Sequence, residues 1–448
     1  MVGDATPSLT HRRILATWWP LAASWLLMGL EGPLISAAVA RLAAPKINLA
    51  AFGGVVFPIA LLVESPIVML LAASTALSRD RAAYRKIRRF MHWLAASLTL
   101  AHTLLVFTPL YGFVVEGLIG APPEVVGPAR IGLAIMVPWT WAIAYRRFNQ
   151  GVLIRFGHSR AVGTGTVVRL ASEVLALAAA FTLGSVPGIV VAALAIDAGV
   201  LSEAAYARLR VQSVLRDEMS EADGRGVLGL HSFLVFYIPL SLTSIISLAV
   251  SPLGSAAMSR MPNALESLAA WPVVTGVGFM FRSFGFAYNE VVVALLDEPG
   301  AAARLRRFAL VMAAASSCGL LLLLVPSIGS FWFRDVTGLS ENLARIAQRS
   351  VWFAIPLPAL SVLQSWFQGA IVHSGRTRAI TEAVALSLAT TAVVLAVGVV
   401  WGGVIGLYVG VVALAAGDTL RTGWLALRSR AAHRNGGTDS PQPRRPAQ

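Results

Sequence analysis

Long apolar runs separated by short polar stretches recur along the whole chain. Each run has about the 20 residues that an α-helix needs to cross the hydrocarbon core of a bilayer. The runs show no alternation of apolar and polar residues, which is the pattern of outer-membrane strands. The chain is therefore predicted to be an all-α, polytopic membrane protein with about twelve spans. The predicted spans are 14–40, 49–77, 88–110, 129–154, 161–184, 187–208, 229–252, 268–296, 308–326, 348–373, 379–400 and 403–427.

The composition agrees with a location in the membrane. Of the 448 residues, 56% are hydrophobic and 13% are charged, whereas a soluble domain carries roughly a quarter charged residues. The polar side chains are too few to cover a water-facing surface, which excludes a soluble enzyme and a disordered protein. The formal net charge of +14 does not indicate a nucleic-acid partner, because the arginines lie in short loops between apolar runs.

The arginines are divided unequally between the two sets of loops. One set contains Arg12-Arg13, the segment from Arg79 to Arg89, the segment from Arg304 to Arg307 and an arginine-rich C-terminal tail. The other set contains few basic residues. Because arginine-rich loops stay on the cytoplasmic side, we expect a protein of the cell (inner) membrane with both termini in the cytoplasm. A signal peptide cleaved after Ala40 is an alternative.

The chain also contains an internal repeat. The segment from Pro33 to Arg41 matches the segment from Pro252 to Arg260, and Gln150-Gly151 matches Gln368-Gly369 at nearly the same spacing. Each half then holds about six spans, and an even number of spans makes the two copies parallel. Two facing bundles of this kind are typical of transporters that work by alternating access. The repeat also gives the first span a counterpart in mid-chain, which argues against a signal peptide.

These observations predict four regions. The segment 1–208 forms an N-terminal six-helix bundle, and 209–228 forms a polar cytoplasmic linker. The segment 229–428 forms a C-terminal six-helix bundle. Residues 429–448 are rich in Arg, Pro and Gly, a composition that predicts a disordered cytoplasmic tail.

Several local strings carry a resemblance to a known family. They are the stretch from Gly120 to Val125 after the third span, and Gln150-Gly151 followed by a turn at 157–160, with a second copy from Gln368 to Arg378. With six spans per half, the chain resembles the multidrug and toxin extrusion (MATE) family and its superfamily of polysaccharide and lipid-linked flippases. The resemblance implies export or flipping driven by an ion gradient or by the membrane potential.

Other strings resemble a narrower family within that superfamily. Trp19-Pro20-Leu21, the stretch from Ser78 to Arg81 and the stretch from Ile355 to Pro358 are similar to the progressive ankylosis protein family. That resemblance implies export of small polyanions such as pyrophosphate, citrate or nucleotides. Typical bacterial MATE proteins have an aspartate in the first span, whereas this sequence has Glu31.

Two glutamates lie inside predicted spans, where an ionisable side chain is costly unless it faces a cavity or a partner. Glu31 is followed by Gly32-Pro33, and Glu64 is followed by Ser65-Pro66. Proline removes a helix hydrogen bond and kinks the helix, which frees carbonyl oxygens to ligate an ion. We therefore predict that Glu31 and Glu64 couple transport to a proton or a sodium ion. The alternative is that both glutamates cap broken helix ends.

Basic residues inside the spans suggest an anionic substrate. Arg282 lies near the centre of the eighth span, with Glu290 two turns later, and Arg146 and Arg147 lie in the fourth span. We predict that these four residues bind substrate. Two alternatives stay open: Arg282 forms a structural ion pair with Glu290 or with Glu64 across the cleft, and the two adjacent arginines snorkel to the interface.

Other ionisable residues in the spans are given structural interpretations. Arg169 and Glu173 are four residues apart on one predicted helix and are expected to pair with each other. Glu382, Asp197 and Asp418 have no obvious partner in the sequence.

The leading functional hypothesis is a secondary active exporter of small organic or phosphate-bearing anions. The alternatives are a cation or drug antiporter of the MATE type, in which Glu31 and Glu64 hold the substrate, and a lipid-linked saccharide flippase. We expect a monomer in the lipid bilayer, with a small-molecule substrate and a proton or sodium ion as its partners.

Enzymatic activity, a metal site and a cofactor are not expected. A membrane-embedded enzyme would need a clustered catalytic set at one membrane face, and the sequence offers none. His92 and His102 share one helix but have no cysteine, histidine or carboxylate at ligand spacing. The chain also lacks the phosphate-binding motif GxxxxGK[ST], so we expect no ATP hydrolysis.

Overall fold

The computed structural model of the chain describes residues 9–184, 186–221, 229–373 and 378–436. All regular elements in these residues are helices. The first half contains α1 (His11–Val39), α2 (Pro45–Leu49), η1 (Ala50–Val56), α3 (Phe57–Glu64), η2 (Ile67–Met69), α4 (Leu70–Leu77), α5 (Arg81–Phe107), α6 (Leu110–Gly112), η3 (Phe113–Ile119), α7 (Pro123–Ile135), α8 (Val137–Arg155), α9 (Ser159–Leu183) and α10 (Gly188–Asp217).

The second half has a similar succession of long helices. It contains α11 (Leu230–Leu248), α12 (Val250–Met258), α13 (Ala264–Phe286), α14 (Tyr288–Leu295), α15 (Ala301–Leu321), η4 (Leu322–Leu324), α16 (Pro326–Ser330), η5 (Phe331–Val336), α17 (Glu341–Ala354), α18 (Pro356–His373), α19 (Arg378–Trp401) and α20 (Gly406–Gly436).

The helices have the lengths of membrane spans. Among the described residues, ten helices or continuous helix series are long and apolar enough to cross a membrane, and α7 with α8, bent by 43°, makes an eleventh. Helix α20 has the length of a further span, although Asp418 and Arg421 in its interior lower its hydropathy. Each predicted run lies on one of these helices or helix series, which confirms the all-α prediction.

Two helices continue beyond the ends that the sequence predicts. Helix α10 extends to Asp217, so the predicted linker 209–228 begins as helix, and its residues 222–228 lie outside the described residues. Helix α20 ends at Gly436, so the predicted disordered tail 429–448 also begins as helix, and 437–448 lie outside the described residues. Both extensions contain Arg and Leu or Ala, which are good helix formers. The predicted second turn, at 374–377, is not among the described residues either.

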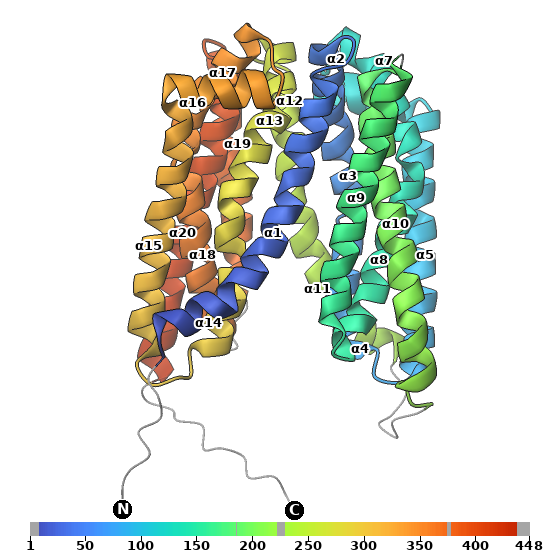
Figure 1. Ribbon diagram of the computed structural model, residues 1–448, viewed down its shortest axis with the longest axis vertical. Coiled ribbons are helices and arrows are strands. Elements are labelled where there is room, and N and C mark those ends of the chain that lie inside the picture. The colour runs from blue at the N-terminus through green and yellow to red at the C-terminus, as the bar shows by residue number, and fades with distance from the viewer. Residues whose placement is uncertain (1–8, 185, 222–228, 374–377, 437–448) are drawn as a thin grey trace, which may run out of the picture.

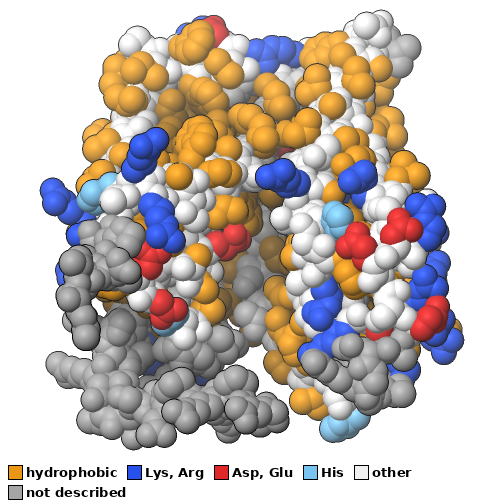
Figure 2. All heavy atoms as spheres, turned by 60° about the horizontal axis from the view of Figure 1, so that its bottom comes forward, with side chains coloured by type: hydrophobic (Ala, Val, Ile, Leu, Met, Phe, Trp, Pro, Cys, Tyr) orange, Lys and Arg blue, Asp and Glu red, His pale blue; other side chains and the backbone are white. Residues whose placement is uncertain are grey.

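The long helices form two lobes (Figure 1). We call α2 to α10 the N-lobe and α12 to α20 the C-lobe. The lobes meet at one end, the top of Figure 1, and diverge toward the other end, where α1 begins and α20 ends. Figure 2 brings this second end forward and shows a hollow between the two lobes. We call the two ends the closed end and the open end.

Helices α1 and α11 each run between the lobes. Helix α1 begins against the C-lobe, where the indole Nε1 of Trp18 donates a hydrogen bond of 2.9 Å to the carbonyl oxygen of Phe284, and it ends beside α2 of the N-lobe (Figure 1). Helix α11 has the opposite arrangement, because the Tyr237 hydroxyl donates to the carbonyl oxygen of Pro66 in the N-lobe at 2.5 Å. The first turns of each half therefore rest on the other half.

Small residues bring the lobes into close contact toward the closed end. A Cβ atom on Gly53 of η1 would lie 2.3 Å from the side chain of Pro272 in α13, and one on Gly54 would lie 2.9 Å from Leu268. No Cβ atom fits at 2.3 Å, so the approach of η1 to α13 requires glycine at position 53. Small residues at helix contacts allow this kind of backbone approach in membrane proteins.

Two arginines tie the lobes together at the closed end. Nη2 of Arg41, which follows α1, donates to the carbonyl oxygens of Asp335 at 2.5 Å and Val336 at 3.0 Å, at the end of η5. Arg260, which follows α12, donates to the three carbonyl oxygens of Gly117, Leu118 and Ile119 at the end of η3. Helix C-terminal carbonyl groups lack intrahelical partners and carry partial negative charge. We call these contacts the arginine latch.

The arginine latch contains one equivalent contact from each half of the repeat. Arg41 and Arg260 occupy matching positions of the repeat, and each reaches a π-helix of the other half. Beside them, the Lys46 ammonium group pairs with the Glu266 carboxylate across the same contact. The reciprocal contacts show that the two halves meet in a similar way from both sides.

Candidate functional site

Buried charged side chains gather inside the N-lobe and against α1. They come from five helices, so the site exists only after those helices have packed together. We call this group the N-lobe cluster; it comprises Glu31 of α1, Glu64 of α3, Arg146 and Arg147 of α8, Arg169 and Glu173 of α9, and Glu203 of α10.

Arg169 is the central cation of the N-lobe cluster. Its Nη2 contacts both carboxylate oxygens of Glu31, and its Nε donates to Glu173 Oε1 at 2.9 Å, in the pairing expected from the sequence. Its Nη1 lies 4.0 Å from Glu203 Oε2. The predicted coupling residue Glu31 is therefore in an ion pair, and this pair joins α1 to α9.

Arg146 and Glu203 form a second pair in the same cluster. Arg146 Nη1 donates to Glu203 Oε2 at 2.5 Å, and both side chains are buried, with 5% and 1% of their surface exposed. Gln150 Nε2, one turn further along α8, donates to Glu203 Oε1 at 2.8 Å. Arg146 is therefore held inside the lobe, which rules out the interpretation that it snorkels to the interface.

Glu64 lies at a break in the second span, as its sequence context predicts. Helix α3 ends at Glu64, Ser65 donates its hydroxyl hydrogen bond to the Leu62 carbonyl oxygen at 2.6 Å, and the chain continues as the short 3₁₀-helix η2. Glu31 differs, because α1 runs through Pro33 as one continuous helix to Val39. The prediction that Glu31 lies at a broken helix end is therefore wrong.

Glu64 and Arg147 keep unsatisfied polar atoms in the cluster. Four buried atoms of the cluster have no hydrogen-bond partner among the residues that the structure describes: Glu64 Oε2, Arg147 Nε, Arg146 Nε and Glu173 Oε2. The neighbouring charges that act on Glu64 are those of Arg147, Arg146, Arg169 and Glu31. Glu64 is thus the carboxyl of the N-lobe cluster with no ion pair of its own, and it has capacity left for a proton or a small cation.

Counting charges shows an imbalance in the N-lobe cluster. Its four carboxyl groups face three guanidinium groups, so full ionisation leaves one excess negative charge. An uncompensated buried charge is costly, and one bound proton or sodium ion removes it. Asp197 of α10 is also buried, but no charged group acts on it among the described residues.

The C-lobe has a smaller group of charges with the opposite imbalance. Nη2 of Arg282 in α13 lies 2.8 Å from Oδ2 of Asp418 in α20. Arg421, one turn after Asp418, is close enough for both charges to act on it, and its Nε is buried without a partner in the described part of the chain. We call Arg282, Asp418 and Arg421 the C-lobe cluster. Two guanidinium groups and one carboxylate leave one excess positive charge.

The ion pair of Arg282 corrects the sequence prediction. Neither Glu290 nor Glu64 is its partner, and Glu290 is exposed, with no ion pair to any described residue. Eight residues on a continuous helix place two side chains roughly 80° apart, and here the helix is also interrupted between α13 and α14. Glu290 is therefore not in the C-lobe cluster.

A glutamine from α18 completes the C-lobe cluster. Gln364 Nε2 donates to the carbonyl oxygen of Asp418 and to the Thr422 hydroxyl, each at 3.2 Å. The aromatic ring of Phe286 lies under the Arg282 guanidinium, 5.6 Å from its central carbon. These contacts fix the Arg282–Asp418 pair but leave Nε of Arg282 without a partner among the described residues.

The repeat places opposite charges at matching positions. Gly184 and Gly402 both precede the last helix of their half with positive φ, and α10 and α20 then begin at Gly188 and Gly406. In this register Arg421 of α20 corresponds to Glu203 of α10. The inversion gives the two lobes different chemistry: the N-lobe can hold a cation, and the C-lobe can hold an anion.

Glu203 and Arg421 were not among the site residues predicted from the sequence, and Asp418 had no predicted partner. Each of them lies inside or at the end of a predicted apolar run, which was itself a signal. The identity of the partner was not available, because Arg146, Arg169 and Arg282 lie on other helices. No group of three or more His, Cys, Asp or Glu residues that could hold a metal ion is present among the described residues.

Solved structures with the same architecture are transporters and a flippase. The fold matches an inward-facing MATE family transporter of the MOP superfamily with a TM-score of 0.65, at 13% identity over 94% of this chain and 99% of that chain. It also matches a MOP superfamily transporter from Pyrococcus furiosus, described as having a binding pocket of reverse polarity, with a TM-score of 0.65, at 15% identity over 97% of this chain and 100% of that chain.

The lipid II flippase MurJ in its inward closed conformation is a further match, with a TM-score of 0.61, at 12% identity over 95% of this chain and 94% of that chain. No protein-family model matches the chain, and no curated protein matches it in sequence. The chain therefore has the MATE fold that its sequence resemblance implies.

Proposed function

We propose that this protein is a secondary active exporter of small organic or phosphate-bearing anions that works by alternating access. The observation that carries the proposal is the opposite charge imbalance of the two clusters. A proton or sodium ion neutralises the excess negative charge of the N-lobe cluster, and an anionic substrate neutralises the excess positive charge of the C-lobe cluster. The two ligands then bind on different lobes.

The moving parts in this proposal are the two bundles predicted from the sequence, 1–208 and 229–428. The distribution of arginines supports a cell (inner) membrane protein with its termini in the cytoplasm, so the open end faces inward and the arginine latch closes the outward side. Export requires the latch to open and the hollow at the open end to close. The protein acts as a monomer, since each chain contains both lobes.

The ion site consists of Glu64 with the Glu31–Arg169 pair. When a proton or sodium ion neutralises Glu64, the charge that Arg147 and Arg169 experience changes, and Arg169 is the residue that holds α1 through Glu31. Because α1 runs between the lobes, a change in this pair is able to reach the C-lobe. Ligand binding shifts such an equilibrium only through different affinities for the two forms.

The substrate site consists of Arg282 and Arg421. The Asp418 carboxylate is paired with Nη2 of Arg282. An anionic substrate binds the other guanidinium nitrogens of Arg282 and those of Arg421. Guanidinium groups bind carboxylates and phosphates in bidentate fashion. Citrate and pyrophosphate are probes of suitable chemistry.

Transport in vesicles tests this function. The purified protein is reconstituted into liposomes, and uptake of citrate, pyrophosphate and a cationic dye is measured under an imposed proton or sodium gradient. The proposal expects gradient-driven movement of an anion that Arg421→Gln abolishes. If only the dye moves, and its movement is unchanged in Arg421→Gln and lost in Glu64→Gln, the anion-exporter proposal is wrong. The protein is then a cation or drug antiporter in which the N-lobe cluster binds the substrate.

A further inference from the structure

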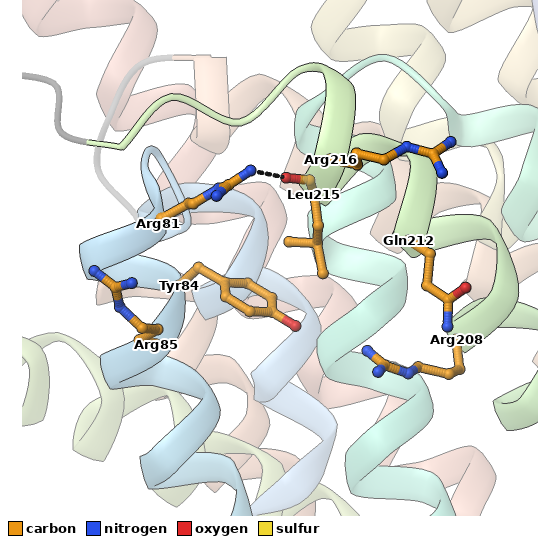
Figure 3. A pocket seen from close by; sticks show the side chains of 7 residues that line it. All are labelled: Arg81, Tyr84, Arg85, Arg208, Gln212, Leu215 and Arg216. Carbon is orange, nitrogen blue, oxygen red and sulfur yellow. Dashed lines mark hydrogen bonds between the residues drawn. The ribbon is translucent and has the colours of Figure 1, made fainter.

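The open end of the N-lobe carries a pocket that plays no part in the proposed transport cycle. It lies between the first turns of α5 and the last turns of α10, and its volume is about 460 Å³. Four arginines line it, Arg81 and Arg85 from α5 and Arg208 and Arg216 from α10. In Figure 3, Arg81 and Arg208 reach toward the space between the two helices, whereas Arg85 lies at the outer edge, on the far side of Tyr84 from Arg208, and Arg216 points away. No acidic side chain lines the pocket.

Two of the four arginines have their charge compensated and two do not. Arg81 pairs with Glu221 at 2.6 Å and also donates to the Leu215 carbonyl oxygen at 2.8 Å. Arg216 pairs with its neighbour Asp217 at 2.9 Å. Arg85 and Arg208 form no ion pair or hydrogen bond with any residue that the structure describes. The pocket therefore presents two unpaired guanidinium groups.

The position of these arginines is unfavourable for the protein alone. Arg81 and Arg85 lie in the first turns of α5, where the helix dipole is positive and disfavours cations. Asp80, which caps this helix by accepting a hydrogen bond from the Ala83 amide at 2.8 Å, is not among the residues that line the pocket. A bound anion would offset the repulsion between the arginines and the dipole.

The floor of the pocket is rigid and largely apolar. The Tyr84 ring is buried and lies 5.2 Å from the Phe148 ring of α8, centroid to centroid, and Leu215 lies opposite it (Figure 3). The volume of about 460 Å³ is roughly fifteen times the share of one water molecule in the liquid. That is much more than a single phosphate ion requires, and it suits a phosphate group with a glycerol-sized substituent.

The same helix connects the pocket to the lipid-facing surface. Exposed residues follow Arg85 along one face of α5 at spacings of three or four, and the apolar ones include Trp93, Leu100 and Phe107, with 71%, 58% and 62% of their surface exposed. Such a stripe lies along one face of a helix. Trp93 lies about 12 Å along the helix axis from Arg85. Acyl chains on this stripe place their headgroup at the arginines.

We propose that this pocket binds the headgroup of an anionic phospholipid, with Arg85 at its outer edge, beside the exposed face of α5, and Arg208 on the inner side of Tyr84 (Figure 3). Arg81 and Tyr84 shape its walls, and the acyl chains lie along the exposed face of α5. With the topology proposed above, the lipid belongs to the cytoplasmic leaflet. The chemistry that is recognised is a phosphate group, which a free phosphate or a phosphomonoester also carries.

Native mass spectrometry of the purified full-length protein tests the site. The protein is titrated with phosphatidylglycerol, with phosphatidylcholine and with inorganic phosphate, and the bound species are counted. Arg85→Gln, Arg208→Gln is the test variant, and Arg79→Gln, Arg160→Gln is the matched control, because Arg79 and Arg160 are also exposed at this end but neither line the pocket nor lie on α5. Both double variants remove the same charge.

The expected result is a loss of affinity for phosphatidylglycerol of about tenfold or more in the test variant, and less than twofold in the control. Phosphatidylcholine, which has no net charge, and inorganic phosphate bind wild type more weakly than phosphatidylglycerol. Equal phosphatidylglycerol binding by all three proteins overturns the site. Inorganic phosphate that binds as tightly as the lipid overturns the lipid assignment.

A folding control keeps the comparison valid. Arg85 and Arg208 have no partners within the described protein, so the test variant should unfold at the same temperature as wild type in detergent without added lipid. Added phosphatidylglycerol should raise the unfolding temperature of wild type and of the control variant but not of the test variant. A shift of the same size in the test variant contradicts the proposal.

Discussion

Removing Arg260 should open the closed end of the molecule. Arg260 is the larger half of the arginine latch, because it donates to three carbonyl oxygens at the end of η3, whereas Arg41 donates to two at the end of η5. Arg260→Ala removes these three hydrogen bonds of Arg260 to the other lobe. Its side chain lies on the surface, so the substitution leaves no cavity in either lobe.

The size of the effect follows from the hydrogen bonds that are lost. A hydrogen bond contributes about 0.5–1.5 kcal/mol net, and the exposed position of Arg260 puts each contact in the lower part of that range. Three contacts at about 0.5–1 kcal/mol each give about 1.5–3 kcal/mol. Every 1.4 kcal/mol changes an equilibrium constant about tenfold, so the ratio of closed to open forms should fall roughly ten- to a hundredfold.

Spin-label distances measure this ratio. Nitroxide labels at Glu124→Cys in α7 and Asn342→Cys in α17 report the separation of the lobes at the closed end, in a Cys318→Ser background because Cys318 is exposed. We expect one short distance in wild type and an additional long distance after Arg260→Ala. Arg41→Ala should act in the same direction with a smaller effect.

The control variant removes an arginine at the same end that does not join the lobes. Arg345 pairs with Glu341 within α17 at 3.3 Å, so Arg345→Ala should leave the distance distribution unchanged. If Arg260→Ala gives the same single distance as Arg345→Ala, the arginine latch does not hold the lobes together, and the reasoning is refuted.

Three further outcomes are expected. Glu64→Gln should abolish gradient-driven uphill transport in liposomes while the variant still binds substrate by calorimetry, and uphill transport at the wild-type rate would dismiss Glu64 as the coupling residue. Arg282→Ala should lower the unfolding temperature in detergent, since it leaves the Asp418 carboxylate without its ion partner, at a cost of about 1–3 kcal/mol for this part-buried pair. Asp418→Asn in the same chain should restore part of the loss; no restoration would mean that the unpaired Asp418 charge does not cause the loss. Gly53→Val should reduce the yield of folded, monodisperse protein, because its Cβ would lie 2.3 Å from Pro272, and a normal yield would show that η1 and α13 are free to separate.

The membrane spans could be predicted from the sequence because their cause is local. A helix must satisfy its own backbone hydrogen bonds in lipid and must be apolar over about 20 residues. Both requirements depend on residues that are consecutive in the sequence. The break after Glu64 has the same local origin, since Pro66 cannot continue the hydrogen bonds of α3. Glu31 shows the limit of this reasoning: with the same Glu-x-Pro pattern, α1 stays continuous through Pro33, so the local pattern alone does not decide whether a helix breaks.

The match between Arg41 and Arg260 could also be read from the sequence, but their role could not. Both arginines donate to the carbonyl groups of a π-helix in the opposite half, and contacts between residues so far apart depend on how the lobes meet. The ends of α10 and α20 could not be predicted either, because polar residues end the apolar pattern of the sequence several residues before each helix ends.

The partners of the buried charges were decided by tertiary structure alone. Arg169 and Glu173 share one helix, so their pairing followed from helical periodicity. Arg282 could not be assigned to Asp418, because α13 and α20 are separated by most of the C-terminal half and the sequence does not state which helices are neighbours. The charge imbalance of each cluster is a property of that neighbourhood, since it depends on which carboxyl and guanidinium groups the packed helices bring within reach of one another.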